Sequence, residues 1–405
     1  MLPGLNIKFT NGNIGNVVST EDGVLGLIAS AVAVADTFEL DKAYEVKSMQ
    51  DVAALGITPD VNNYHLYKAL EEFYAEAGSG TKLWLMGVAK TTTVTSWFTV
   101  NVGTGKAPVH TMLDKAKGEI SGVFTCYDPS EAITVENGMD ADVPLAIAAA
   151  QKLAEDYTKD NYAPFYVILE AYGYTGVASD LPALTERTDN RVAVFVGETK
   201  ERTGDVSHNG AASQVLAGRL STLQVQENAG KVKRGSLETL TAFIVDDAVE
   251  DVDVEALHDK GYITFRTHAR KAGYYFTDDP LATDPEEDYN GIARRRVIDK
   301  AYRLAHNVAS EEILEDFTLT NQGAIDPFYA ASVEGNIERE IATKMTANGE
   351  LSASPTDKDD LGVKAKFDAE ANVSTTNKIN LTLQVRPKGY ARFFEIALGY
   401  GVTLN

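Results

Sequence analysis

The sequence predicts an α/β fold in which a parallel sheet carries helices on both of its faces. Two observations lead to this fold. Strand and helix patterns alternate over residues 21–205, and the strands are apolar on both faces rather than on one. With 405 residues, 44% of them hydrophobic, the chain can bury a sizeable core. A chain of this length is expected to form two or three domains.

The first element expected is a short strand near the N-terminus. Leu5, Ile7 and Phe9 alternate with polar residues, as in a strand with one buried face. The polar stretch TNGNIGN (10–16) then predicts a flexible link. A strand on such a tether can pair with its own domain or with a neighbouring chain.

From about residue 23 the elements alternate. Residues 64–78 predict a helix with one apolar face and Gly78 just past its end. Further helices are expected over 107–118, 140–160, 211–223, 252–261, 289–315 and 327–347. Strands are expected over 81–89, 119–128, 164–173, 191–198, 239–245, 262–277, 378–386 and 390–402.

No catalytic or metal motif is complete in this sequence. Residues 101–110 (NVGTGKAPVH) lack both the first glycine and the hydroxyl residue of a phosphate-binding loop. Residues 172–180 lack the full dinucleotide fingerprint, and the acidic loop 277–288 lacks the order of a calcium hairpin. The six histidines show no metal-ligand spacing. We therefore expect no enzyme, metal or cofactor, and keep as the alternative an α/β enzyme that binds a small phosphorylated ligand.

The net charge and the cysteine content limit the kinds of partner and the cellular compartment that we expect. A net charge of −22 opposes binding to nucleic acid and to anionic lipid. The single cysteine, Cys126, excludes an intrachain disulfide and fits a reducing compartment. The longest apolar run, residues 23–35, is too short to span a bilayer. These features predict a soluble cytosolic product.

Residues 291–308 form a basic stretch in this acidic chain. On a helical wheel an apolar stripe runs beside a second stripe of cations, so we expect a helix that buries one face and exposes a cationic flank. Acidic residues of the same chain or an acidic patch on a neighbouring protein could meet these cations. The apolar stripe is Val297, Ala301, Leu304 and Val308, and the cationic stripe is Arg296, Lys300 and Arg303. Arg294 and Arg295 stand at the N-terminal start of the helix.

Four stretches of the C-terminal half occur in a recognisable order. They are SQVLAGRLSTLQVQENAGKVKRG (213–235), ALHDKGYITFRTHARKAGYYFTDDPLATD (256–284), YNGIARRRVIDKAYRLAHNV (289–308) and LQVRPKGYARFFEIALGYGV (383–402). Together they resemble the sheath subunit of contractile phage tails and related contractile injection systems. Residues 44–56, followed by a helix and KLWLMGV, are similar to the amino-terminal part of the same family.

The resemblance implies a domain order and a function. We expect an arm over 1–20, an α/β domain over 21–205, a sheath-type core domain over 206–389 and a second arm over 390–405, with both arms exchanging strands between subunits. The implied function is a structural subunit that polymerises as hexameric rings around an inner tube and contracts to drive that tube through a cell envelope. The implied partners are further copies of the chain, the tube protein, and baseplate and tail terminator proteins. The implied location is a tail sheath assembled in the bacterial cytoplasm, in a phage or in a bacterial injection system.

The resemblance also assigns contact residues. Leu5, Ile7 and Phe9 would insert at one end of the chain, and Phe394, Ile396 and Leu398 at the other. The first candidate for a tube-facing helix is 327–347, where Val333, Ile337, Ile341 and Met345 pack inward and Arg339 and Lys344 stay available. The cations at 294–303 are the second candidate for the tube and are equally suited to contacts between subunits.

Overall fold

The computed structural model describes residues 21–202, 208–392, 394–396, 398 and 400. Leu5, Ile7 and Phe9 lie outside these residues. The chain forms two compact units, Met1–His306 and Asn307–Asn405. The predicted boundary between residues 205 and 206 falls inside the first unit.

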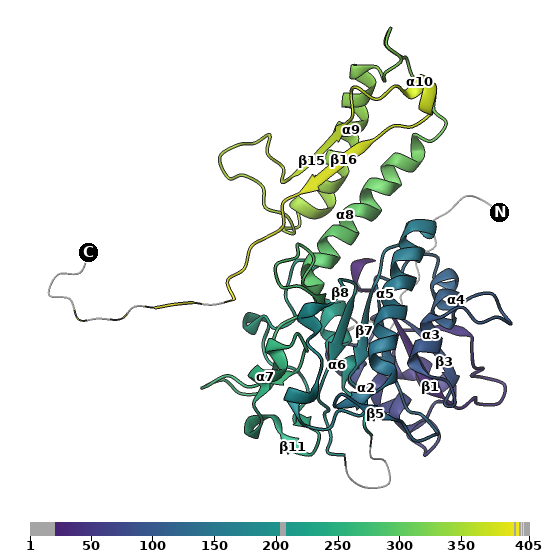
Figure 1. The fold of residues 1–405 in the computed structure, drawn as a ribbon, viewed down its shortest axis with the longest axis vertical. Coiled ribbons are helices and arrows are strands. Elements are labelled where there is room, and N and C mark those ends of the chain that lie inside the picture. Colours follow the sequence, from purple (N-terminus) through teal and green to yellow (C-terminus); the bar gives the residue numbers. More distant parts are fainter. Residues whose placement is uncertain (1–20, 203–207, 393, 397, 399, 401–405) are drawn as a thin grey trace, which may run out of the picture. The chain divides into compact units, whose positions relative to one another are not determined.

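A six-stranded sheet organises the first unit, in the order β2-β3-β1-β4-β7-β9 (Figure 1). Five strands are parallel, and the edge strand β2 is antiparallel to β3. Every residue of β1, β4, β7 and β9 is buried, as strands covered on both faces require. The strands are β1 (Leu25–Ala31), β2 (Ala43–Val46), β3 (Leu83–Ala89), β4 (Gly122–Cys126), β7 (Tyr166–Glu170) and β9 (Val192–Phe195).

Helices cover both faces of this sheet (Figure 1). On one face α2 (Tyr64–Ala77) packs against α6 (Ser213–Thr222), and on the other α3 (Val94–Phe98) packs against α4 (Pro108–Lys115) and α5 (Asp142–Asn161). The helix predicted over 64–78 is confirmed, with Gly78 as its C-terminal cap. The predicted parallel sheet with flanking helices is therefore confirmed.

The second half of the first unit is mostly irregular, with short elements. The strand predicted over 239–245 reduces to β10 (Phe243–Ile244), and 262–277 forms the two ends of a hairpin, β12 (Phe265–Arg266) and β13 (Tyr275–Phe276). The other short elements are α1 (Met49–Ala54), α7 (Val254–Asp259), β5 (Val135–Glu136), β6 (Met139–Asp140), β8 (Thr188–Asp189), β11 (Asp247–Ala248) and β14 (Ala282–Thr283). The 3₁₀ turns are Glu21–Gly23, Ala178–Asp180, Leu184–Glu186, Val232–Arg234 and Val249–Asp251.

The basic stretch forms α8 (Ile292–Glu311), a helix whose residues up to His306 belong to the first unit. Val297 and Ala301 of the predicted apolar stripe are buried in it, and Leu304 and Val308 are half-buried.

The second unit is a small helix-on-sheet layer. α9 (Pro327–Ile341) begins at Asp326, whose side chain caps the first turn, and continues into a π-helical turn, Ala342–Thr346. It packs on β15 (Val363–Phe367), which pairs antiparallel with β16 (Leu381–Val385); α10 (Val373–Thr376) lies between them in sequence. Sequence patterns predicted α9 and β16 but missed β15, although its two lysines alternate with apolar residues as in a half-buried strand. The inward-facing residues predicted for α9 and its continuation are confirmed as buried: Val333, Ile337, Ile341 and Met345.

Candidate assembly site

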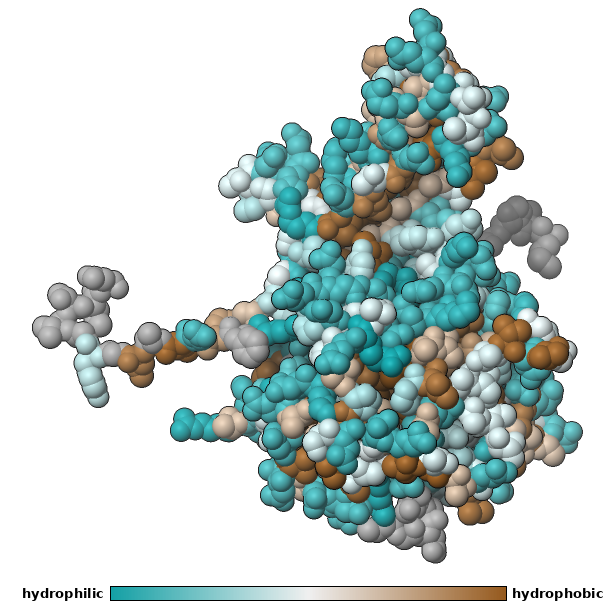
Figure 2. All heavy atoms as spheres, in the orientation of Figure 1, coloured by the Kyte–Doolittle hydropathy of each residue, from teal (hydrophilic) through white to brown (hydrophobic). Residues whose placement is uncertain are grey.

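The C-terminal segment, residues 390–400, exposes large apolar side chains. Phe394, Ile396 and Leu398 are 85%, 83% and 95% exposed, and Figure 2 shows the brown apolar atoms of this segment in the open. The strand predicted over 390–402 is not formed by the described residues of this segment. An exposed segment with alternating apolar residues promotes aggregation of a single chain. In an assembly, the same segment can add as a strand to the sheet of a neighbouring chain.

The second unit contains a two-stranded sheet, β15–β16. Two strands alone are marginally stable in water, and β15–β16 is supported by α9 on one face. Val363 and Ala365 of β15 are buried beneath this helix, whereas Leu381, Leu383 and Val385 of β16 are half-buried. A sheet of this kind has room for further strands.

Arg339 on α9 and Lys344 on its π-helical continuation are the first candidates from the sequence for contact with the tube. Arg339 and Lys344 are exposed, and Arg339 donates a hydrogen bond to Asn336 Oδ1 at 3.1 Å. Both cations are therefore accessible on this helix, which is the condition that the predicted contact requires.

The cations of α8 lie mostly inside the first unit, so the predicted exposed flank is wrong. Arg295 and Arg296 are 8% and 3% exposed, and only Arg294 of the five is classed as exposed. Arg296 donates to the carbonyl of Leu223 at 2.9 Å, and Arg303 donates to that of Ile120 at 3.0 Å. Wheel geometry placed these side chains on a flank of the helix. It could not show that loops and strands of the same chain cover that flank.

Asp299 is the ionic centre of this region. It accepts from Arg191 at 3.0 Å and from Arg295 at 2.8 Å, and all three side chains are nearly buried. Burial lowers the pKa of the Arg191 guanidinium, and the adjacent Asp299 carboxylate opposes that shift. These charges hold α8 to the sheet and are not available to a partner.

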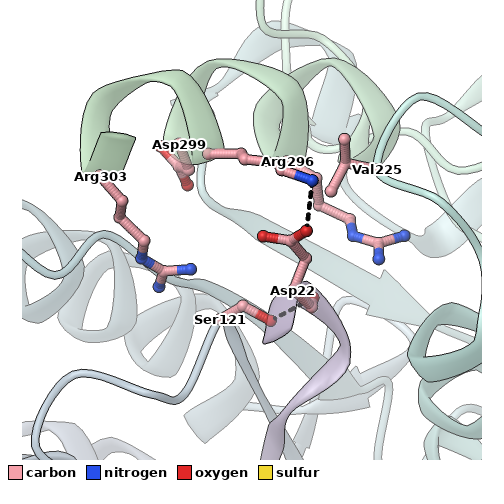
Figure 3. Close-up of a pocket in the computed structure, with 7 residues that line it drawn as sticks. Asp22, Ser121, Val225, Arg296, Asp299 and Arg303 are labelled. Atoms are coloured by element: carbon pink, nitrogen blue, oxygen red, sulfur yellow. Dashed lines mark hydrogen bonds and ion pairs between the residues drawn. The ribbon is translucent and has the colours of Figure 1, made fainter. Parts of the chain in front are cut away.

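A small pocket lies between α8 and the start of the first strand. In Figure 3, Asp22 and Ser121 face Arg296, Asp299 and Arg303, and the Asp22 carboxylate lies 2.6 Å from Lys300 Nζ. Its cavity volume is about 10 Å³, which is the room that one water needs. The cations would suit a phosphate group, but the cavity is too small to hold one.

The carboxyl ends of β4, β7 and β9 meet at the sheet edge where α/β enzymes bind ligands. Here the edge is filled by a buried ionic network. Lys68 Nζ lies 2.7 Å from Glu198 and 3.2 Å from Glu72, while His208 lies 3.4 Å from Glu198. The Glu170 carboxylate accepts from the backbone N–H groups of Tyr127 and Ala211 at 2.6 and 3.1 Å.

Burial and the charges of the partners act against each other on the pKa values of this network. Burial raises the pKa of Glu170 to about 7, against the opposing charge of His208. Burial acts to lower the pKa of His208, but its hydrogen bond to Glu198 and the charge of Glu170 raise it overall. The carboxylates of this network already have partners within the chain. We therefore infer that the network stabilises the fold by joining α2 and the segment after residue 207 to the sheet.

The two glycine-containing loops, in residues 101–110 and 172–180, form ordinary turns in the structure. Residues 101–106 form a turn before α4, and Pro108 occupies the first turn of that helix, where a phosphate loop would need a donor N–H. Gly173 has a φ of +72°, and its N–H donates to the carbonyl of Asn209 at 2.7 Å.

Within the described residues, no group of three or more histidine, cysteine or acidic side chains is placed to hold a metal ion. Nor does any helix of that part of the chain have the length and apolar character needed to cross a membrane.

Three solved structures share this fold over nearly the whole chain. The helical sheath of the anti-feeding prophage in its contracted state matches with a TM-score of 0.62 and 14% identity, over 98% of this chain and 99% of that one. The baseplate of the anti-feeding prophage contains a chain that matches at 0.61 and 13%, over 99% of both. The contracted PVC sheath complex of an extracellular contractile injection system matches at 0.54 and 14%, over 99% of this chain and 98% of that one.

The chain thus has the fold of sheath subunits of contractile injection systems, as the resemblance predicted. It belongs to the DUF2586 family: the family's N-terminal domain matches residues 2–280 and its C-terminal domain matches residues 288–405. Comparison with curated protein sequences finds no match.

Proposed function

We propose that this protein is the structural subunit of a contractile sheath and not an enzyme. It polymerises as stacked hexameric rings around an inner tube, and its contraction drives the tube through a target cell envelope. The observation that carries the proposal is the C-terminal segment, whose Phe394, Ile396 and Leu398 are exposed on a chain with a sheath fold. Apolar side chains this open call for a partner surface.

The arms are the joints of the proposed lattice. Residues 390–405 of one subunit, and residues 1–20 with Leu5, Ile7 and Phe9, add strands to sheets of adjacent subunits. Each main-chain hydrogen bond gained contributes about 0.5–1.5 kcal/mol, and the alternating side chains add burial. Such head-to-tail contacts close into a ring where the rotation between subunits closes, and they extend the assembly along the tube where it does not.

Contraction is then a rigid-body reorientation of subunits that keep their own folds while the arms act as hinges. Weak polar contacts between Arg339, Lys344 and the tube suit a surface that must release, because exposed ion pairs contribute only about 0–1 kcal/mol each. The further partners are baseplate and tail terminator proteins. The place of assembly is the bacterial cytoplasm, in a phage or in an injection system.

Negative-stain microscopy of the purified chain tests this function. The full chain is expected to form rings or tubes, and a chain shortened by residues 390–405 is expected to stay single with its circular dichroism unchanged. A shortened chain that still forms tubes contradicts the proposed role of the arm. A full chain that stays single at high concentration contradicts the proposed function.

A further inference from the structure

The pocket beside α8 is lined by three cations and two carboxylates (Figure 3). Its lining residues are Asp22, Ser121, Val225, Arg296, Asp299, Lys300 and Arg303, and all of them belong to the first unit. Three cations against two carboxylates leave one positive charge in excess at the lining. A positive excess at a closed site stands out in a chain whose net charge is −22.

The carboxylates of the pocket are already held by other cations. The Asp22 carboxylate lies 2.6 Å from Lys300 Nζ, and Figure 3 shows the guanidinium groups of Arg296 and Arg303 on either side of it. Asp299 is bound by Arg191 and Arg295, as described above. Because these carboxylates have cationic partners already, their charge is not left over for further cations.

Two of the five cations of α8 are therefore without a counter-charge. Arg294 is exposed to water, and Arg295 and Lys300 form ion pairs. Among the described residues, Arg296 and Arg303 form no ion pair with any carboxylate. A buried cation is costly unless it is paired, so these two side chains call for an anion.

Four buried donor atoms around the pocket also lack a hydrogen-bond partner within the described part of the chain. They are Arg296 Nε and Nη1, Arg303 Nε and Tyr166 Oη. Arg296 and Tyr166 are only 3% and 1% exposed, so bulk water does not reach them. Unpaired buried donors are rare in folded proteins and commonly mark a bound water or ion.

Tyr166 reaches this group from the sheet. It is the first residue of β7, and its ring lies so close to Gly122 of β4 that a Cβ there would be 2.5 Å from Tyr166 Cζ. Burial raises the pKa of the Tyr166 hydroxyl, and the positive charges of Arg296 and Arg303 oppose that shift. The unpaired hydroxyl thus lies in the field of the same two guanidinium groups.

The size of the cavity limits what can meet these donors. Its volume of about 10 Å³ leaves room for a single small particle. A water molecule would fit, but it brings no charge to balance the cations. A monatomic anion such as chloride is only slightly larger than water, accepts hydrogen bonds from every side and supplies the missing charge. Phosphate and sulfate are too large.

We propose that this pocket binds one monatomic anion of the size of chloride, for which Arg296 and Arg303 supply the positive charge and the unpaired donors. The anion lies between α8 and the turn that precedes β1, so it stabilises the contact of these two elements. This ligand site goes beyond the proposed function, which needs no ligand, and either can fail without the other.

Thermal unfolding of the purified full chain at constant ionic strength tests the site. Sodium chloride replaces sodium gluconate stepwise, because gluconate is an organic anion too large for the cavity. A ligand that binds only the folded state stabilises it in proportion to the logarithm of its concentration above the Kd. We expect the unfolding temperature to rise by about 2 °C for each tenfold increase in chloride.

Substitution of the two arginines locates the effect. R296M and R303M each remove a charge and its donors but keep an apolar side chain, and each should abolish the dependence on chloride. R294M is the matched control on the same helix, because Arg294 is exposed and outside the pocket, and it should keep the full rise. Comparing chloride with gluconate within each variant removes any general loss of stability from the readout.

Two results would overturn the inference. An unfolding temperature of the wild-type chain that is the same in chloride and in gluconate assigns the cavity to water. A rise that persists in both R296M and R303M places the anion elsewhere on the chain. If one of these variants does not fold, the other variant and the wild-type chain still decide the question. Tube formation by the wild-type chain remains the separate test of the proposed function.

Discussion

At the scale of single residues, the most consequential group is Asp299. It is the shared partner of Arg191 and Arg295, and its side chain is 7% exposed. Replacing it by alanine leaves two buried guanidinium groups without their carboxylate. We expect D299A to lower the free energy of unfolding by about 3–5 kcal/mol in urea titrations. R294A, at the exposed neighbour, should change it by less than about 0.5 kcal/mol. Equal effects of the two variants would contradict this assignment.

Glu170 predicts a pH dependence. Its pKa is raised by burial from 4.5 to about 7, so the folded state holds this proton more tightly than the unfolded chain does. Stability from this group is complete below about pH 4.5 and is lost as the pH rises through about 7. Relative to E170Q, the wild-type chain should lose on the order of 3 kcal/mol between about pH 4.5 and about pH 8. A pH-independent difference between the two unfolding free energies would contradict this.

At the scale of elements, helices and strands with strong patterns could be predicted from the sequence, and their surroundings could not. The helix over residues 64–78 can be identified from its periodicity, and the strands of the sheet from short, continuous apolar runs. The cationic stripe of α8 also has a clear period, but Leu223 and Ile120, which receive its hydrogen bonds, are 73 and 183 residues away. No local pattern reports such tertiary partners.

The same reason explains what was missed in the second unit. Glu334 and Glu338 have the spacing of ordinary exposed helix carboxylates, and only the register of β15 shows that they meet backbone donors. The alternation of Phe394, Ile396 and Leu398 predicts a strand, which the described residues of this segment do not form.

The next prediction concerns the proposed contact between the tube and the exposed cations of α9 and its continuation. R339E/K344E should weaken assembly around the tube while leaving the unfolding free energy within about 0.5 kcal/mol, because both side chains are exposed. Co-sedimentation of sheath with tube measures the effect, and K358E, in an exposed polar loop of the same unit, is the control for charge. Unchanged co-sedimentation of the double variant would remove these residues from the tube surface.

At the scale of the whole molecule, the function belongs to the assembly. A net charge of −22 makes free chains repel one another, so specific joints must overcome that repulsion. Deletion of residues 1–12 should abolish polymerisation in negative-stain microscopy and leave the circular dichroism spectrum intact, since the proposed arm adds its strand to another subunit. Tubes formed by this shortened chain would contradict the role of the N-terminal arm.

The central claim is that the ends of each chain are completed by other copies, and amide hydrogen exchange of the C-terminal segment before and after assembly tests it most directly. In the free chain the amides around Phe394, Ile396 and Leu398 should exchange at the rate of an open peptide. In assembled tubes they should become strongly protected. Fast exchange of this segment in tubes, or full protection already in the single chain, would contradict the account.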